Sequence, residues 1–228
     1  MNIFGVQKLT LLDYPNKTAA TVFLSGCNFR CQFCHNASLI NDTDNAGGLE
    51  ADEVLSFLKT RINLLDGVCI SGGEPLLYND IENFISQIKE LGFSVKLDTN
   101  GQLHERLKSI INNKLVDYIA MDIKNSLKNY GTTIGIPNFD TANIEKSADL
   151  LTSGSLPYEF RTTVVRELHN TDDFHLIGKR FKGAKKYFLQ YFKDTGDVLI
   201  PNLSAYNEDE MQKLLDILTA YIPSAALR

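Results

Sequence analysis

The sequence predicts an α/β fold in which parallel strands form a partial, TIM-like (β/α)6 barrel of six strand–helix units. Strand-like and helix-like stretches alternate from residue 19 to residue 221, and this alternation is typical of a parallel sheet with right-handed crossovers. A closed barrel has eight such units and needs roughly 250 residues, so six units favour an open one. The chain has 228 residues and no linker-like or repeated segment. We therefore expect one domain over residues 1–228, with an N-terminal extension over residues 1–18.

Composition narrows the class of protein. Lysine and arginine total 23 against 28 aspartate and glutamate residues, a net charge of −5, and no basic block argues for nucleic-acid binding. The sequence shows no secretory signal and no apolar run of membrane-spanning length. Clustered cysteines in such a chain indicate metal ligands rather than disulfides. We expect a cytoplasmic protein in a reducing compartment, with neither a nucleic-acid nor a membrane partner.

The elements of the first half follow from turn residues and apolar spacing. Residues 2–18 are strand-like around a turn at 13–16, which predicts a hairpin. Helical spacing of apolar residues is clear at Val54, Leu55 and Leu58 and again at Ile81, Phe84 and Ile88. The predicted strands are 19–25, 67–71, 93–98 and 116–122, and the predicted helices are 51–64, 80–91 and 103–112.

The second half continues the alternation after a longer loop. Residues 125–139 contain two glycines and a proline and are expected to form a loop, which at this length is more often functional than inert. Gly154 is expected to end the next helix. The predicted strands are 158–165 and 186–192, and the predicted helices are 141–151, 172–181 and 208–221.

Three of the four cysteines, Cys27, Cys31 and Cys34, follow the first predicted strand with the spacing C-x3-C-x2-C. Structural zinc sites and ordinary [4Fe–4S] clusters take four protein ligands. Three clustered thiols therefore favour a cubane cluster with one iron open to a small molecule. A zinc site completed by His35 or Cys69, or three unrelated thiols, remain as alternatives.

This cysteine triplet, with Phe33 before its last member, resembles the signature of the radical S-adenosylmethionine (SAM) enzymes. His35-Asn36 after it makes the chain more similar to the glycyl-radical-enzyme activases. Further segments resemble the anaerobic ribonucleoside-triphosphate reductase activating proteins and, in chain length, pyruvate formate-lyase activating enzyme. These segments are 11–15 (LLDYP), 71–75 (SGGEP), 97–101 (LDTNG) and 121–124 (MDIK). The resemblance covers residues 4–191.

The resemblance implies a radical SAM fold and a reaction. It implies one [4Fe–4S] cluster on Cys27, Cys31 and Cys34, which reduces bound SAM so that a 5′-deoxyadenosyl radical forms and removes a hydrogen from a glycine of a partner enzyme. The implied partner is an anaerobic ribonucleotide reductase, with a flavodoxin or ferredoxin as electron donor. Two rival classes remain: a radical SAM enzyme acting on a small molecule, similar to 7-carboxy-7-deazaguanine synthase, and a non-catalytic metal-binding module.

The same resemblance implies which residues contact SAM. Gly72 and Gly73 have no Cβ and allow a close backbone approach, and Glu74 offers a carboxylate to a cation such as the SAM ammonium group. A plain turn is the alternative for this segment. Paired carboxylates at the strand ends would hold the SAM ribose or a monovalent cation near the sulfonium. The residues at these strand ends are Asp98 and Thr99 and, on the next strand, Asp122 and Lys124. Arg161 is expected to neutralise the SAM carboxylate, and Phe33 is expected to pack against adenine.

Each of these residues also has a structural interpretation. Asp98, Asp122, Lys124 and Arg161 could instead form a salt-bridge network, and Phe33 could simply exclude water. Alternation along a strand predicts that Asp122 and Lys124 share one face.

The remaining cysteine, the histidines and one glutamine have expected locations of their own. Cys69 is expected in the core, and His35 is expected to hold the cysteine loop by a hydrogen bond. His104, His169 and His175 are expected at the surface. Gln190 stands near the place where pyruvate formate-lyase activating enzyme has a histidine-containing segment.

Overall fold

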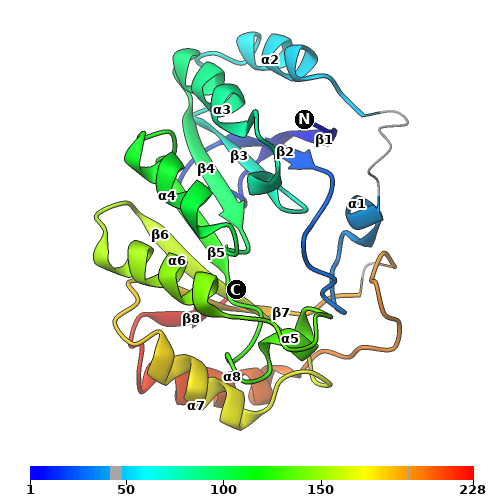
Figure 1. The fold of residues 1–228 in the computed structure, drawn as a ribbon, viewed down its shortest axis with the longest axis vertical. Helices are drawn as coiled ribbons and strands as arrows, with labels where there is room; N and C mark the ends of the chain where they lie inside the picture. Colours follow the sequence, from blue (N-terminus) through cyan, green and yellow to red (C-terminus); the bar gives the residue numbers. More distant parts are fainter. Residues whose placement is uncertain (42–47, 195) are drawn as a thin grey trace. The chain divides into compact units, whose positions relative to one another are not determined.

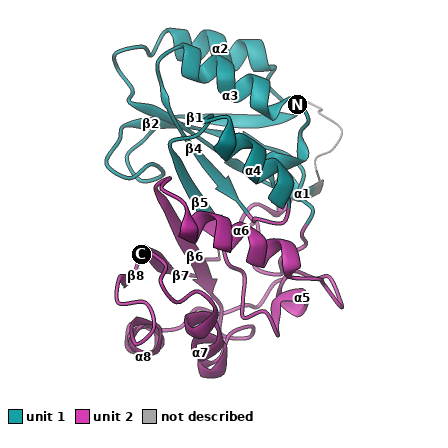
Figure 2. Cartoon of the chain, turned by 60° about the vertical axis from the view of Figure 1, so that its left-hand side comes forward, with its two compact units in different colours: residues 1–28, 38–99, 103–120 teal, residues 29–37, 100–102, 121–228 magenta. Residues whose placement is uncertain are grey.

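The structure is a computed structural model that describes residues 1–41, 48–194 and 196–228. The chain divides into two compact units, which Figure 2 colours separately. Unit 1 contains residues 1–28, 38–99 and 103–120, and unit 2 contains residues 29–37, 100–102 and 121–228. Strand order follows chain order from β1 to β8. Figure 1 labels these strands and colours them from blue to red along the chain. The predicted α/β class with parallel strands in an open sheet is confirmed.

Unit 1 is built on a parallel sheet with one antiparallel edge strand. β2 pairs with β3 and β3 with β4 in parallel register, so that Thr21, Cys69 and Lys96 lie side by side across three strands. Most residues of these strands are buried on both faces, which is typical of a parallel sheet covered by helices. The strands are β1 Ile3–Thr10, β2 Ala19–Leu24, β3 Gly67–Gly72, β4 Ser94–Thr99 and β5 Tyr118–Asp122, of which the last two residues belong to unit 2.

The N-terminal extension has the predicted strand and turn, but the turn leads into β2 rather than into a second strand within residues 2–18. It forms a single long strand, β1, that pairs antiparallel with β2 and thus extends the main sheet. Tyr14 in the following turn is buried against Tyr118, and a Cβ on Gly67 would meet its ring. The turn therefore fills the space at the beginning of the strands, away from the strand ends that carry the cysteines.

The helices of unit 1 are amphipathic and short. α3 buries Ile81, Phe84 and Ile88 on one face, as their spacing predicts. α2 ends at Lys59, five residues before the predicted end, and Asn63 beyond it has a left-handed backbone. The helices are α1 Ala37–Asn41, whose first residue belongs to unit 2, α2 Ala51–Lys59, the 3₁₀ turn η1 Pro75–Leu77, α3 Ile81–Glu90 and α4 His104–Asn112.

Unit 2 continues the strand–helix alternation. The backbone N–H of Ile123 donates to Arg161 O, which ties the end of β5 to β6. β6 pairs with β7 and β7 with β8, all in parallel. The strands are β6 Tyr158–Val164, β7 Tyr187–Tyr191 and β8 Ala225–Leu227, and the helices are α5 Tyr130–Thr133, α6 Ala142–Ser153, α7 Thr171–Arg180 and α8 Glu208–Thr219.

Helix starts in unit 2 follow from capping chemistry. The Asn170 side chain accepts hydrogen bonds from the backbone N–H groups of Asp172 and Asp173, and the Asp173 carboxylate accepts from Asn170 N. Asn207 and Glu210 form the same reciprocal arrangement at α8. Each arrangement satisfies backbone donors that a helix start otherwise leaves without a partner.

Two elements of unit 2 were not predicted from the sequence. The 125–139 loop contains the one-turn helix α5, and the chain ends in β8. Arg228 donates two hydrogen bonds to the buried Glu159 carboxylate and lies over the Phe188 ring, which fixes β8 against its neighbours. Within residues 1–41, 48–194 and 196–228, no helix is long and apolar enough to cross a membrane.

Candidate cofactor site

The cysteine loop follows β2, as predicted. All four cysteines lie in described residues and are thiols rather than disulfides. Cys27 belongs to unit 1, whereas Cys31 and Cys34 belong to unit 2, and Cys31 is the most buried of the three. Among the described residues, no three side chains of the His, Cys, Asp and Glu types stand together as a ready-made metal site. The convergence of the three thiols on one cluster thus stays a prediction.

Gly72 and Gly73 bring the end of β3 against the start of the cysteine loop. Gly72 has φ +121°, and a Cβ there would lie 2.3 Å from Leu24 N and O. A Cβ on Gly73 would lie 1.8 Å from Gly26 O. The backbone N–H groups of Gly73 and Glu74 donate to Leu24 O and Gly26 O, both at 2.8 Å. Only residues without a Cβ permit this contact, so the two glycines position the segment that carries Cys27.

Glu74 is fully buried and its carboxylate is held in place. Oε1 accepts a hydrogen bond from Leu76 N at 3.0 Å and another from Thr99 Oγ1 at 2.9 Å. Pro75 begins the 3₁₀ turn that Glu74 caps. Thr99, predicted as a SAM contact, therefore has an observed role in orienting Glu74.

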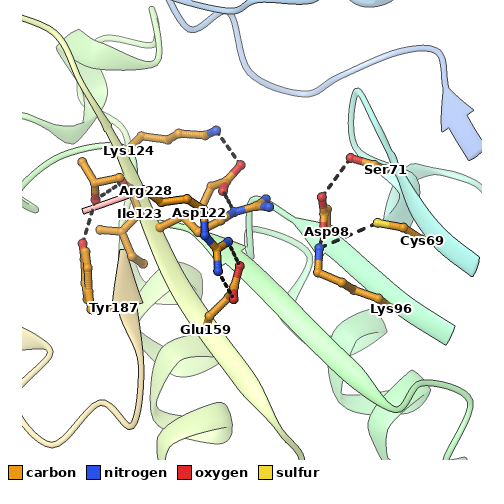
Figure 3. A network of polar contacts seen from close by, with 12 residues as sticks. Cys69, Ser71, Lys96, Asp98, Asp122, Ile123, Lys124, Glu159, Tyr187 and Arg228 are labelled. Atoms are coloured by element: carbon orange, nitrogen blue, oxygen red, sulfur yellow. Dashed lines mark hydrogen bonds and ion pairs between the residues drawn. The ribbon is translucent and has the colours of Figure 1, made fainter. Parts of the chain in front are cut away.

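Asp98 lies at the end of β4 in a compact polar cluster of unit 1 (Figure 3). Its Oδ1 pairs with the buried Lys96 ammonium, and its Oδ2 accepts from Ser71 Oγ at 3.1 Å. Lys96 Nζ is also 3.7 Å from Cys69 Sγ. Cys69 is completely buried, as predicted, and the charged Lys96 is one of its neighbours in the core.

Asp122, Lys124 and Arg161 form an ion-pair network in unit 2. Arg161 Nε donates to Asp122 Oδ1 at 2.8 Å, and Lys124 Nζ donates to Asp122 Oδ2 at 3.0 Å. Burial alone would raise the pKa of Asp122, but the two cations outweigh it and hold that pKa well below the ordinary range. These three residues thus form a salt-bridge network, which was the structural alternative to cofactor contact. Their contact with a cofactor stays a prediction.

Lys124 also faces the cysteine loop. Burial would lower the pKa of Lys124, but the charges of Asp122 and Cys31 raise it well above its ordinary value. Its ammonium lies 5.9 Å from the centroid of the buried Phe33 ring. Lys124 therefore keeps its positive charge beside the segment that carries Cys31 and Cys34.

His169 was predicted at the surface, and this prediction is wrong. It is buried, its Nε2 lies 2.9 Å from Lys124 O, and its Nδ1 accepts from Val165 N at 3.1 Å. The neutral ring with its proton on Nε2 donates to the Lys124 carbonyl and accepts from Val165 N, whose own carbonyl oxygen lies 3.2 Å from Nδ1. The ring also packs edge-on against Phe33. His169 thus connects the end of β6 to the backbone that carries Lys124.

A second buried network supports the same loop from α7. The Asp173 carboxylate accepts from Ser126 Oγ at 2.5 Å and from Asn129 Nδ2 at 2.7 Å. Asn125 donates to Thr133 Oγ1 and to a backbone carbonyl, both at 2.8 Å. Fully hydrogen-bonded buried polar groups give a rigid arrangement, so the loop after Lys124 is well held.

Replacing His169 tests this support. His169→Leu is expected to lower the free energy of unfolding by about 1–3 kcal/mol, because the buried Lys124 carbonyl loses its donor. His169→Gln keeps an N–H donor and is expected to lose less. Urea unfolding at neutral pH measures both variants, and a leucine variant as stable as the wild type would contradict the role.

The contribution of His169 to the stability of the fold is expected to depend on pH. Burial lowers the pKa of His169 from 6.5, so the unfolded chain binds this proton more readily than the folded protein. The stabilisation by the neutral ring is therefore complete above pH 6.5 and decreases as the pH falls below it. The stability difference between wild type and His169→Gln is expected to shrink between about pH 7.5 and pH 5.5, near and below the unperturbed histidine pKa.

The two ends of the cysteine loop carry buried polar atoms without hydrogen-bond partners. In the part of the chain that the structure describes, these atoms include Ser25 Oγ and His35 Nδ1. Burial lowers the pKa of His35, and its ring stacks on Phe192 at 5.4 Å between centroids. His35 forms a hydrogen bond with the backbone of Lys193, although its Nδ1 has no partner, so the expected hydrogen bond of this ring is made outside the cysteine loop. Three thiols and such orphaned polar atoms fit a loop that takes a further group.

Comparison with known proteins identifies one family and related activating enzymes. Residues 21–170 match the family described as the radical SAM superfamily. A predicted glycyl-radical enzyme activating enzyme of Methanocaldococcus jannaschii is 34% identical over 233 residues, covering 99% of this chain and 95% of that protein. A pyruvate formate-lyase-activating enzyme of Clostridium pasteurianum is 35% identical over 130 residues, covering 54% and 52%.

Solved structures agree in fold. Streptococcus suis SuiB bound to its precursor peptide SuiA aligns with a TM-score of 0.72 at 18% identity, covering 91% of this chain and 48% of that one. At this identity the likeness concerns the fold alone.

Proposed function

The chain belongs to the radical SAM superfamily, among the glycyl-radical enzyme activating enzymes, and on this premise we propose that it installs a glycyl radical on an anaerobic ribonucleotide reductase. The observation that carries the activating-enzyme part of the proposal is the 34% identity to a predicted activating enzyme over 99% of this chain. The position of three thiols directly after β2 supports it.

Cys27, Cys31 and Cys34 would hold one [4Fe–4S] cluster, and three thiolate ligands leave one iron position open for SAM. When both are bound, they supply the electron and the carbon–sulfur bond from which a 5′-deoxyadenosyl radical forms to take the α-hydrogen of a partner glycine. The chain contributes orientation, charge and exclusion of water.

Unit 1 contributes a fixed backbone. The contact between Gly73 and Gly26 holds the Cys27 segment, and Glu74 is oriented by Thr99. In the proposed complex, the residues at 72–74 bind the SAM ammonium group. A fully buried carboxylate suits a cationic partner because charges attract more strongly away from bulk water.

Unit 2 contributes positive charge. Asp122, Lys124 and Arg161 carry one net positive charge between them, a sum that suits the carboxylate of SAM. Phe33 is buried beside Lys124, and in the proposed complex it packs against adenine and keeps water from the cluster.

The partner and the electron donor are the finer parts of the proposal. The segments 11–15, 71–75, 97–101 and 121–124 resemble those of activators of anaerobic ribonucleotide reductase. A flavodoxin or ferredoxin is the proposed reductant, and four cysteine thiols suit a reducing cytoplasm. The single-domain organisation of residues 1–228 is likewise a proposal.

Anaerobic electron paramagnetic resonance tests the proposal. Reconstituted, reduced protein is mixed with SAM and an anaerobic ribonucleotide reductase, and a matched sample lacks the reductase. A glycyl doublet in the complete mixture alone is the expected result. SAM-dependent release of 5′-deoxyadenosine without a doublet would reject this partner, and turnover of the pterin substrate of 7-carboxy-7-deazaguanine synthase would favour the small-molecule alternative.

A further inference from the structure

A lysine is buried inside the sheet of unit 1. Lys96 lies in the middle of β4 and is 1% exposed. An ammonium group removed from water must be paired, because its desolvation is otherwise very costly. Its partner is Asp98 Oδ1, two residues along the strand and on the same face, as Figure 3 shows.

Both oxygens of the Asp98 carboxylate accept hydrogen bonds within unit 1. Lys96 occupies Oδ1, and Ser71 Oγ donates to Oδ2 at 3.1 Å. Asp98 is one of the two carboxylates that the sequence resemblance assigns to a monovalent cation or to the SAM ribose. A potassium or sodium ion binds oxygen lone pairs, so at Oδ1 it would compete with an ammonium group of the same charge.

The second carboxylate of that assignment is also neutralised by the chain itself. In unit 2, Asp122 Oδ1 accepts from Arg161 and Oδ2 accepts from Lys124. Asp98 therefore already has one side-chain cation and a hydroxyl on its oxygens, and Asp122 has two side-chain cations. A monovalent cation does not fit these carboxylates as the structure holds them.

We propose that the Lys96 ammonium is a built-in counter-ion that replaces a bound monovalent cation, so that SAM binding by this protein is independent of potassium and sodium. The inference rests on the proposed function, since it concerns the SAM site of that function. Lys96 acts through Asp98 and is a positioning residue.

The wild-type holoenzyme gives the first test. SAM affinity of the reconstituted protein is measured in tetramethylammonium chloride and in potassium chloride at equal ionic strength. The dissociation constant is expected to change by less than about twofold, because an ammonium group already supplies the charge. A saturable strengthening of about fivefold or more by potassium would overturn the proposal. Thallium-205 resonance of the same protein should show no bound ion, and a bound ion would overturn it as well.

Lys96→Met gives the second test, since methionine has a similar length without the charge. SAM affinity of this variant is expected to fall about tenfold in tetramethylammonium and to recover in potassium. Its melting temperature is expected to rise with potassium, whereas that of the wild type should not. Full affinity of the variant in both salts would remove Lys96 from this role.

Lys89→Met is the matched control. Lys89 also pairs with an aspartate of unit 1, Asp117 at 2.8 Å, but the pair is partly exposed. This variant should show no potassium dependence, because surface pairs are screened by water and salt.

The two proposals can fail separately. If the protein binds no SAM in any salt, the proposed function fails. The potassium dependence of melting in Lys96→Met and the thallium signal of the wild type would still decide whether Lys96 is the counter-ion, because neither measurement needs SAM cleavage.

Discussion

Cys31→Ala is expected to abolish cluster binding and to reduce SAM cleavage by at least about a thousandfold, because two thiolates cannot hold a cubane that needs three. Cys31 is the most buried thiol of the loop, and alanine fits the space it leaves. The variant should therefore stay folded. Iron and sulfide analysis measures the cluster, and chromatography of 5′-deoxyadenosine measures SAM cleavage.

Cys69→Ala provides the matched control for this experiment. Cys69 is the fourth thiol of the chain, is fully buried in β3 and stands outside the cysteine loop. This variant should bind as much iron as the wild type. SAM cleavage at the wild-type rate by Cys31→Ala would refute the ligand assignment, and loss of the cluster in Cys69→Ala would indicate a general effect of thiol removal.

Gly73→Ala is expected to displace the Cys27 segment and to destabilise unit 1 by about 3 kcal/mol, because overpacking against a rigid neighbour has costs of this size. The added Cβ would lie 1.8 Å from Gly26 O and 3.3 Å from Cys27 N. Backbone atoms cannot rotate away as a side chain does, so the segment must shift. Urea unfolding of the cluster-free variant and its iron content after reconstitution are the two measurements.

Gly5→Ala is the control for the added methyl group. Gly5 lies in β1 of the same unit, and a Cβ there would meet no atom within 4 Å. Its stability is expected to stay within about 0.5 kcal/mol of the wild type. A Gly73→Ala variant that matches Gly5→Ala in stability and iron content would show that the close approach is not needed.

The position of the cysteines and charged residues at the strand ends was predictable, because each motif directly follows a predicted strand in the sequence. The cysteine triplet, Gly-Gly-Glu and Asp-Ile-Lys each follow a predicted strand, and alternation correctly placed Asp122 and Lys124 on one face, with Nζ and Oδ2 3.0 Å apart. The salt-bridge network given as the structural alternative also included Arg161, but neither the Lys96 partner of Asp98 nor the atoms that pair could be read from local order. Arg161 lies 39 residues from Asp122 along the chain, and strand pairing alone brings them together.

The burial of Lys96 could not be predicted from the alternation of apolar and polar residues along a strand. Between Val95 and Leu97 a lysine suggests the exposed face of a half-buried strand, yet all three residues are buried. A parallel sheet covered on both sides has no exposed face, so a polar residue in it needs a partner rather than water.

His169 and β8 were missed for a related reason. His169 has polar sequence neighbours, but its contact with Lys124 O spans 45 residues. β8 is too short for any periodic signal, and Arg228 and Glu159, which fix it, are 69 residues apart. Patterns of apolar and polar residues along a short stretch of sequence do not reveal contacts between residues this far apart.

The contact between Gly73 and Gly26 also has a consequence for the entropy of cofactor insertion. It is made by main-chain atoms, and the residues involved have no side-chain rotamers to lose. The backbone leading to Cys27 is therefore ordered when the polypeptide folds, before any iron arrives. At Cys27, incorporation of a cluster then needs to restrict little more than the cysteine side chain, so this part of the loop adds little to the entropy lost on loading.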